Sequence, residues 1–395
     1  MSETLSSVCS EIVDCVNRTA PETIDGAYLL VGTPAMRGNI IDETQARRVS
    51  EETFQIWTRR LEPQAGDLLL AREAPVGPVV IIPEGGHIGA GQRTTHLRAN
   101  PSKVSNRYLY YLLTAPSTQQ RLLGQAMGST VAHLRVADLK SFALPTLPPL
   151  PEQQAVAEVL GALDDKIAAN TALAAKAEEV LRTEVDAEWL SRPDRDAALS
   201  DFVALNPPTP HTTDDTPLYI DMKKLPERGW SVDAPDRREP KGGARFLRGD
   251  TLLARITPCL ENRKTGFVDN IPAGEIAIGS TEFVVLRALP HIAPPIAFLL
   301  ATESRFRDFA IQNMVGTSGR QRVAASDLAR FDMPSPAASW LSGFGERATA
   351  IFTHVESLQN ENRTLAATRD ALLPQLMSGK LRVRDAEQIA SEAGA

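Results

Sequence analysis

Hydrophobic positions along the chain repeat with helical spacing in two long stretches that lie nearly two hundred residues apart. They cover 160–190 and 355–376, and each predicts a long amphipathic helix. The stretches superpose at a shift of 192 residues, which aligns Asn170 with Asn362. In the second stretch, apolar residues recur at alternating intervals of three and four, and Asn362 falls within their stripe. This is the spacing of a coiled-coil seam, in which a single polar residue helps to fix the register. We assign to the seam Leu163, Asn170, Leu173, Val180, Val355, Leu358, Asn362, Leu365 and Leu372.

The segments that precede the two helices also resemble each other. GDLLLAR at 66–72 matches GDTLLAR at 249–255 at a shift of 183 residues. Beyond these, Pro83 matches Pro272 and Asp138 matches Asp327, now at a shift of 189. Several blocks in the same order indicate an internal duplication, whose second copy has about six extra residues near Pro258. An insertion between matched elements is typical of a surface loop.

Each duplicated segment reads as a mixed α/β domain. Short apolar runs such as 27–31, 67–71 and 79–82 are punctuated by Gly and Pro and predict strands, whereas 106–113 predicts a helix. We therefore expect an α+β chain with two tandem mixed α/β domains. Two long helices separate them and form an antiparallel coiled coil with approximate two-fold symmetry. The expected parts are a first domain at 1–149, a first spacer helix at 150–195, a second domain at 196–339, a second spacer helix at 340–382 and a flexible tail at 383–395.

Composition narrows the class of protein. The 395 residues are 43% hydrophobic and 23% charged, as in ordinary globular proteins, and the length suggests two or three domains. The three cysteines form no CxxC pair, which argues against a disulfide frame or a zinc site. The sequence shows no bilayer-spanning apolar stretch and no secretory signal pattern, so a cytoplasmic protein is the simplest expectation. The net charge is −7, but most of the acidic excess lies on the first long helix, so both domains retain room for basic patches.

Three pieces of sequence carry a resemblance to a known family. They are LPPLPEQQAVAEVLGALDDKIAAN at 147–170, GDTLLARITPCLENRKTGFV at 249–268 and LLPQLMSGKL at 372–381. With the duplication, they make the chain resemble the specificity subunit of type I restriction-modification enzymes over nearly its whole length. The resemblance implies that each domain is a target recognition domain that binds one half of a bipartite, asymmetric double-stranded DNA sequence. It also implies that the helices set the gap and dock DNA adenine methyltransferase subunits, and possibly restriction and translocase subunits. The second connector lacks the proline–EQ motif of the first, which makes the two halves unequal.

Glycine- and hydroxyl-rich loops in the two copies are the first candidates for DNA contact. Their backbone N–H groups and hydroxyls suit phosphates, and their longer side chains suit base edges. The alternative is a plain surface turn before a helix. The candidates are Ser129, Thr130, His133 and Arg135 in the first copy and Thr317, Ser318, Arg320, Gln321 and Arg322 in the second.

Further candidates follow the matched strands. Arg72 and Arg255 end the two GDxLLA strands, where a salt bridge to a nearby carboxylate is the competing interpretation. The inserted loop offers Asn262, Arg263 and Lys264 for phosphates or bases, and GAGQRTTH adds Gln92 and Arg93.

Catalytic motifs are missing from the sequence. It has no HExxH, no GxSxG, no P-loop and no acidic-Pro-Pro-aromatic signature of an adenine methyltransferase. We expect a non-catalytic subunit without a metal or cofactor of its own, with S-adenosylmethionine, ATP and Mg on partner subunits. The alternative is an adaptor that uses its coiled coil to organise another defence or modification complex without binding DNA.

Overall fold

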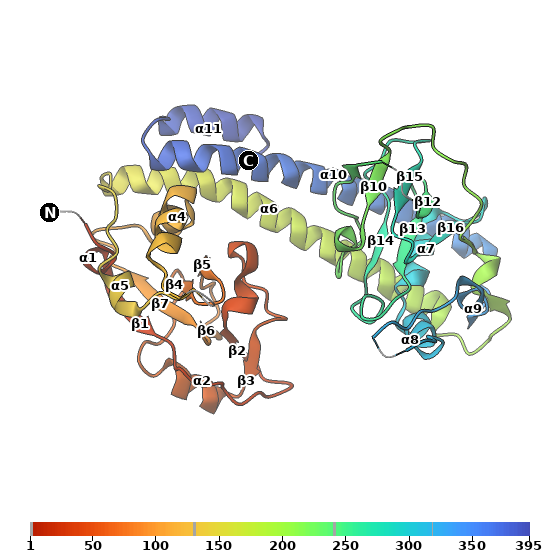
Figure 1. Cartoon of the computed structure of the whole chain (residues 1–395), viewed down its shortest axis with the longest axis horizontal. Coiled ribbons are helices and arrows are strands. Elements are labelled where there is room, and N and C mark those ends of the chain that lie inside the picture. The colour runs from red at the N-terminus through yellow and green to blue at the C-terminus, as the bar shows by residue number, and fades with distance from the viewer. Residues whose placement is uncertain (1–2, 129–131, 240–241, 318) are drawn as a thin grey trace. The chain divides into compact units, whose positions relative to one another are not determined.

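The computed structural model describes residues 3–128, 132–239, 242–317 and 319–395, which fold into two compact units (Figure 1). Unit 1 comprises Met1–Ile167 and Arg363–Ala395, and unit 2 comprises Ala168–Asn362. The division cuts through both long helices, so each unit contains a segment of each. In the part of the chain that the model describes, no helix is both long and apolar enough to span a bilayer.

Unit 1 contains two small sheets. Their strands are β1 (Cys9–Asp14), β2 (Tyr28–Val31), β3 (Arg47–Val49), β4 (Leu68–Arg72), β5 (Val76–Ile81), β6 (Ile88–Ala90) and β7 (Thr94–Ala99). The first sheet is antiparallel and has the order β1-β7-β4-β5. The second has the order β3-β2-β6, with β2 antiparallel to β3 and parallel to β6.

Unit 2 repeats both sheets and adds a two-stranded ribbon. Its strands are β8 (Ala197–Ala198), β9 (Val203–Leu205), β10 (Leu218–Ile220), β11 (Asp236–Arg237), β12 (Ala244–Phe246), β13 (Thr251–Ala254), β14 (Thr265–Phe267), β15 (Ala277–Gly279), β16 (Phe283–Ala288) and β17 (Asp332–Met333). The sheet orders are β14-β13-β16-β9, which is again antiparallel, and β11-β10-β15-β12. The ribbon pairs β17 with β8.

Strand register confirms the duplication residue by residue. Leu68 pairs with Leu97 between β4 and β7, and Thr251 pairs with Leu286 between β13 and β16. These are the partners that the shifts of 183 and 189 residues predict. Register is fixed where one face is buried, because a slip of one residue would turn every core side chain to the other face.

Short helices cover the sheets. Unit 1 has α1 (Leu5–Val8), the 3-10 segment η1 (Thr33–Asn39), α2 (Glu51–Thr58), α3 (Asn106–Thr114), α4 (Pro116–Gln125) and α5 (Val136–Lys140). Unit 2 has η3 (Leu199–Asp201), η4 (Met222–Lys224), α7 (Pro294–Ala301), α8 (Ser304–Gln312) and α9 (Ala325–Leu328). Pro116 begins α4, where its missing N–H leaves no backbone bond unmade.

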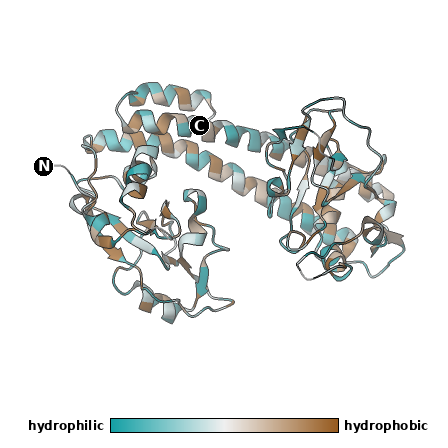
Figure 2. Ribbon diagram, in the orientation of Figure 1, coloured by the Kyte–Doolittle hydropathy of each residue, from teal (hydrophilic) through white to brown (hydrophobic). Residues whose placement is uncertain are grey.

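The two long helices pair antiparallel. They are α6 (Leu150–Val185), which continues into the π-helical turn η2 (Asp186–Leu190), and α10 (Ala338–Met377). In unit 2, Asn170 Nδ2 donates to Asn362 Oδ1 at 2.9 Å, and further along α6 Glu184 contacts Arg347. Residue numbers therefore rise along one helix as they fall along the other. Brown and teal alternate along both helices in Figure 2, as expected of amphipathic segments.

Burial corrects the predicted seam on α6. Leu163 and Asn170 are buried, as are Leu365 and Leu372 on α10, but Leu173 and Val180 are 49% and 51% exposed. The apolar face of α6 instead continues through Ala174, Ala177 and Leu181 in the core of unit 2. The prediction was one position early because the shift of 192 aligns equivalent residues, whereas the orientation of a side chain depends on what packs against it.

The last residues were expected to form a flexible tail, and this was wrong. They form α11 (Val383–Glu392), which lies beside the end of α10 within unit 1 (Figure 1). Ala386 and Ala390 are buried in the same core cluster as Leu372 and Leu376. The segment is rich in alanine and polar residues, but Val383, Ala386 and Ala390 fall on one helical face and supply the burial that holds it.

A buried acid joins the first strands of each main sheet. Asp67 accepts hydrogen bonds from Arg98 Nε at 2.9 Å and from the backbone N–H of Gln64 at 2.9 Å, and it lies 2.8 Å from His96 Nε2. Unit 2 repeats this arrangement with Asp250 and Arg287. Burial alone raises the pKa of Asp67, but the bonds from His96 and Arg98 outweigh it and lower the pKa to about 2.

We expect Asp67→Asn to destabilise the chain by about 2 kcal/mol at neutral pH. The folded pKa lies below the ordinary value of 3.8, so the carboxylate stabilises the fold above that value. This contribution is lost as the pH falls through about 2. Urea unfolding of wild type and variant between pH 7 and pH 2 should show the difference narrowing below pH 4. The exposed Asp370→Asn serves as a control and should change little; an Asp67→Asn difference that stays constant over this range would contradict the assignment.

Candidate nucleic-acid interface

Three segments of unit 1 meet at one edge of the main sheet. The Arg72 N–H donates to the carbonyl of Arg93 at 3.0 Å, and the Leu134 N–H donates to the carbonyl of Arg72 at 2.8 Å. Met127 and His133 exchange two backbone hydrogen bonds of 2.9 Å. These bonds hold together the ends of β4 and β6 and the segment that follows α4. We call this arrangement, residues 72–75, 91–93 and 127–135, the unit 1 rim.

Unit 2 builds the same rim from residues 255–258, 280–282 and 315–323. The Arg255 N–H donates to the carbonyl of Glu282 at 3.0 Å, and the Val323 N–H donates to the carbonyl of Arg255 at 3.0 Å. Val315 and Arg322 exchange the bonds that Met127 and His133 make in unit 1. Both rims carry a cis proline at the same place, after Ala74 and after Thr257. The loops flagged separately in the sequence are thus one site in each unit.

The unit 1 rim exposes several of the predicted side chains. Gln92 and Arg93 are exposed, and Arg93 Nε lies 3.4 Å from a carboxylate oxygen of Glu73. His133 is half-buried, and Arg135 is exposed in an ion pair with Asp138 at 2.8 Å. Ser129 and Thr130, predicted for the same loop, lie outside the described residues.

Arg72 forms the salt bridge that was the competing interpretation. Its Nε lies 2.9 Å from Asp14 Oδ1, and its side chain is 13% exposed. Asp14 stands at the end of β1, 58 residues earlier, so sequence spacing gave no sign of the pair. The predicted DNA contact by Arg72 is therefore replaced by an internal ion pair.

The unit 2 rim differs in its charges. Arg320 and Thr317 are exposed, whereas Gln321 is half-buried and its carbonyl accepts the Thr257 N–H. Arg322 binds Glu282 with contacts of 2.6 and 2.9 Å, and this hydrogen-bonded pair lowers the pKa of the Glu282 carboxyl. Ser318, also predicted here, falls in a gap between the described ranges.

The inserted loop is split between two environments. Asn262 and Arg263 are exposed, but Lys264 points inward and donates to the carbonyl of Met222 at 3.2 Å. That bond argues against Lys264 as a surface contact.

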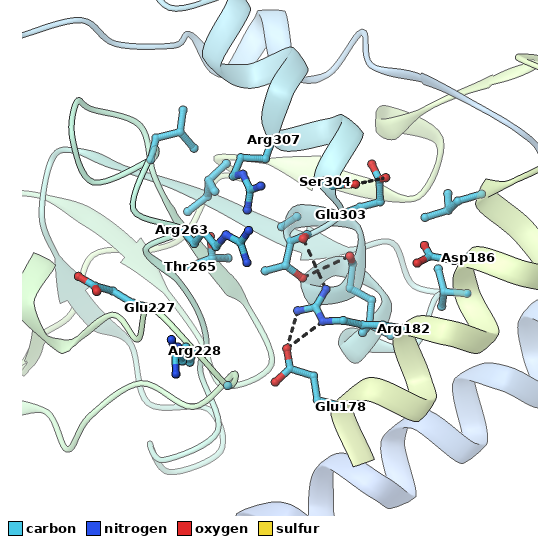
Figure 3. Close-up of a pocket in the computed structure, with 18 residues that line it drawn as sticks. Glu178, Arg182, Asp186, Glu227, Arg228, Arg263, Thr265, Glu303, Ser304 and Arg307 are labelled. Atoms are coloured by element: carbon cyan, nitrogen blue, oxygen red, sulfur yellow. Dashed lines mark hydrogen bonds and ion pairs between the residues drawn. The ribbon is translucent and has the colours of Figure 1, made fainter. Parts of the chain in front are cut away.

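Arg263 also lines a cavity of about 480 Å³ in unit 2. Figure 3 shows it on the same side of this cavity as Arg307, with Arg182 and Glu178 paired below them. Burial and the nearby charge of Arg263 lower the pKa of Arg307. Glu178, Asp186, Glu227 and Glu303 line the cavity as well, so its charges are mixed.

Three rim residues were not predicted: Asp14, Glu73 and Glu282. Each is a carboxylate that pairs with an arginine distant in sequence, and only strand register reveals the partner. In the described ranges, no group of three or more His, Cys, Asp or Glu side chains is placed to hold a metal ion.

Comparison with known proteins points to one family. Residues 47–179 match the type I restriction modification DNA specificity domain. The Escherichia coli type I restriction enzyme EcoEI specificity subunit is 23% identical over 209 residues, which cover 51% of this chain and 34% of that protein. A putative type I restriction enzyme MjaX specificity subunit from Methanocaldococcus jannaschii is 38% identical over 101 residues, covering 26% of this chain and 23% of that protein. The chain thus spans about a third or less of the length of these relatives.

A solved structure extends the likeness to the fold of nearly the whole chain. The type I restriction-modification S subunit from M. genitalium superposes with a TM-score of 0.54 at 14% identity, covering 95% of each chain. The duplicated domains with their long helices therefore form the fold of an S subunit. Domain match, curated relatives and fold together indicate that the chain is a specificity subunit of the type I restriction-modification family.

Proposed function

We propose that this chain is the DNA-sequence specificity subunit of a type I restriction-modification complex. Each rim would contact one half of a bipartite, asymmetric double-stranded target, and the helices would dock methyltransferase and restriction subunits. The observation that supports this most is the duplicated rim. Both units use the same backbone bonds to bring three loops together, yet the side chains those loops carry differ.

The side chains on the rims suit base and phosphate recognition. Gln pairs with adenine and Arg with guanine through two hydrogen bonds in the major groove, and both residue types are exposed here as Gln92, Arg93 and Arg320. The backbone frame below them is held by the sheet, so these side chains extend from a rigid base. Arg93 of unit 1 aligns with Glu282 of unit 2, which reverses the charge at that point of the rim. Unequal rims fit an asymmetric target.

The exposed face of α6 supports a docking role for the helices. Ala169, Leu173, Lys176 and Val180 recur at intervals of four, three and four, which is heptad spacing, and all four are exposed. This outer stripe lies on unit 2 beside the seam that packs against α10. We therefore assign it to a helix of a methyltransferase subunit, with further apolar area buried on assembly.

Catalysis is assigned to the partners. S-adenosylmethionine, ATP and Mg would bind there, and the base to be methylated would be flipped into the partner's pocket.

Arg320→Ala should reduce affinity for the target and relax base preference at one half-site only. The side chain is exposed, so its removal leaves the fold intact, and loss of a two-bond base contact costs about 1 to 3 kcal/mol. Arg93→Ala is the matched change at the other half-site. Binding to a set of duplexes with single base changes would measure both effects. Arg330→Ala is the control, because this arginine is 74% exposed and pairs with Asp327 away from the rim. Unchanged base preference in both rim variants would overturn the rim assignment.

Leu173→Ser with Val180→Ser should weaken capture of the methyltransferase subunit without lowering the thermal stability of this chain. Burying each side chain is worth roughly 1.5 to 3 kcal/mol, and both are exposed in the free chain. Titration of the full chain with the co-expressed methyltransferase would measure the loss. Glu158→Ser, also at an exposed position on α6, should bind normally. Normal binding by the double variant would exclude this face as the docking site.

The purified chain should transfer no methyl group to DNA when supplied with S-adenosylmethionine, and adding the methyltransferase subunit should restore transfer at defined adenines. Radiolabelled methyl incorporation is the measurement. Methylation by the chain alone would contradict the assignment of catalysis to the partners.

A further inference from the structure

A second cavity of unit 2, of about 360 Å³, lies against the rim. Arg245 and Arg255 line it with the hydroxyl-bearing Thr281 and the ring-bearing Phe283, and no acidic residue is among the side chains that form its wall. Arg245 is on β12, Phe283 begins β16 and Arg255 directly follows β13. The cavity therefore opens where the two sheets of unit 2 meet the rim.

Arg255 has no counter-ion of its own. Its Nε is buried without a hydrogen-bond partner, and in the described ranges neither Arg245 nor Arg255 makes an ion pair. The nearest acid is Glu282, whose carboxyl accepts both Nε and Nη2 of Arg322. Arg255 lies close enough to help lower the pKa of Glu282, but its own donors remain unused. A buried charged donor without an acceptor is unfavourable, so the site is incomplete as it stands.

The internal repeat shows what is missing. Arg72 is the equivalent of Arg255, and its guanidinium is bound by Asp14 at the end of β1. Ile12 of β1 pairs with Leu97, and Leu205 of β9 pairs with the equivalent Leu286. Two residues further on, the position of Asp14 is taken by Pro207, which lines the cavity. Unit 1 thus supplies an anion from its own chain, and unit 2 places a neutral ring there.

We propose that the cavity of unit 2 binds a phosphate group, held by Arg255 and Arg245 with the Thr281 hydroxyl. The proposal builds on the DNA-binding function above and assigns this phosphate to the backbone of the duplex at one half-site only. Arginine suits the role because its fixed fork of donors can contact two phosphate oxygens at once. A phosphate contact positions the duplex and carries no sequence information. The unit 2 half-site would thus be anchored by a contact that unit 1 lacks.

The test compares Arg255→Gln and Pro207→Asp with wild type in duplex binding by the full chain over a range of salt concentrations. The first removes the guanidinium, and the second places a carboxylate in the cavity wall as Asp14 does in unit 1. Each should weaken binding roughly five- to tenfold, equally on target and unrelated duplexes. Each should also reduce the slope of log affinity against log salt by about 0.9, the value for one phosphate contact. Arg72→Gln is the matched control, whose charge is already neutralised, and it should leave the slope unchanged.

A second measurement separates this proposal from the DNA-binding function. Inorganic phosphate should raise the unfolding temperature of wild type relative to chloride at equal ionic strength, and the rise should be lost in Arg255→Gln. If wild type binds no duplex but keeps this response, the DNA function fails and the phosphate site stands. If wild type binds duplex DNA while both variants keep its affinity and slope, the phosphate site is overturned. A loss confined to the target sequence would also overturn it, because that result indicates base recognition.

Discussion

The burial of one face of α6 against one face of α10 is the constraint on which the rest of the structure depends. Each helix contributes part of its length to the core of unit 1 and part to the core of unit 2. Leu160 and Leu365 are buried with the first sheet system, and Leu181 and Val355 with the second. Small sheets of three or four strands bury limited apolar surface by themselves. The helices complete both cores, and the rims lie on sheets that the helices stabilise.

A polar contact inside this apolar seam specifies how the helices align. Asn170 and Asn362 occupy equivalent places in the repeat and bind each other, and Asn170 also donates to Glu361 at 2.8 Å. A slip of either helix would bury two amides without partners, which costs more than the bond itself contributes. Asp164 and Arg369 add a 2.6 Å ion pair in unit 1. Apolar burial thus provides the stability of the pairing, while the polar pairs specify its register.

The duplication, the fold class and the helix pairing could be predicted from sequence because each depends on a periodic pattern. The seam on α6 was missed by one position, at Leu173 and Val180, because periodicity alone does not say which neighbour covers a face. The loops of the rims were recognised one at a time, but their convergence depends on backbone bonds such as that between Leu134 and Arg72. The ion pairs of Arg72 and Arg322 join residues tens of positions apart. No local spacing encodes them, so the accessible side chains could be separated from the structural ones only in three dimensions.

The helix α11 gives the chain a particular order of assembly. It belongs to unit 1, together with the last third of α10, although unit 1 also contains the first 167 residues. During synthesis, the whole of unit 2 leaves the ribosome before the residues that close the core of unit 1 exist. The first sheet system must therefore wait, with the faces of Leu160 and Leu163 still uncovered, until the end of the chain arrives. Shortening the chain at its C-terminus would damage the domain at its N-terminus, and the two halves of the sequence are not separable folding modules.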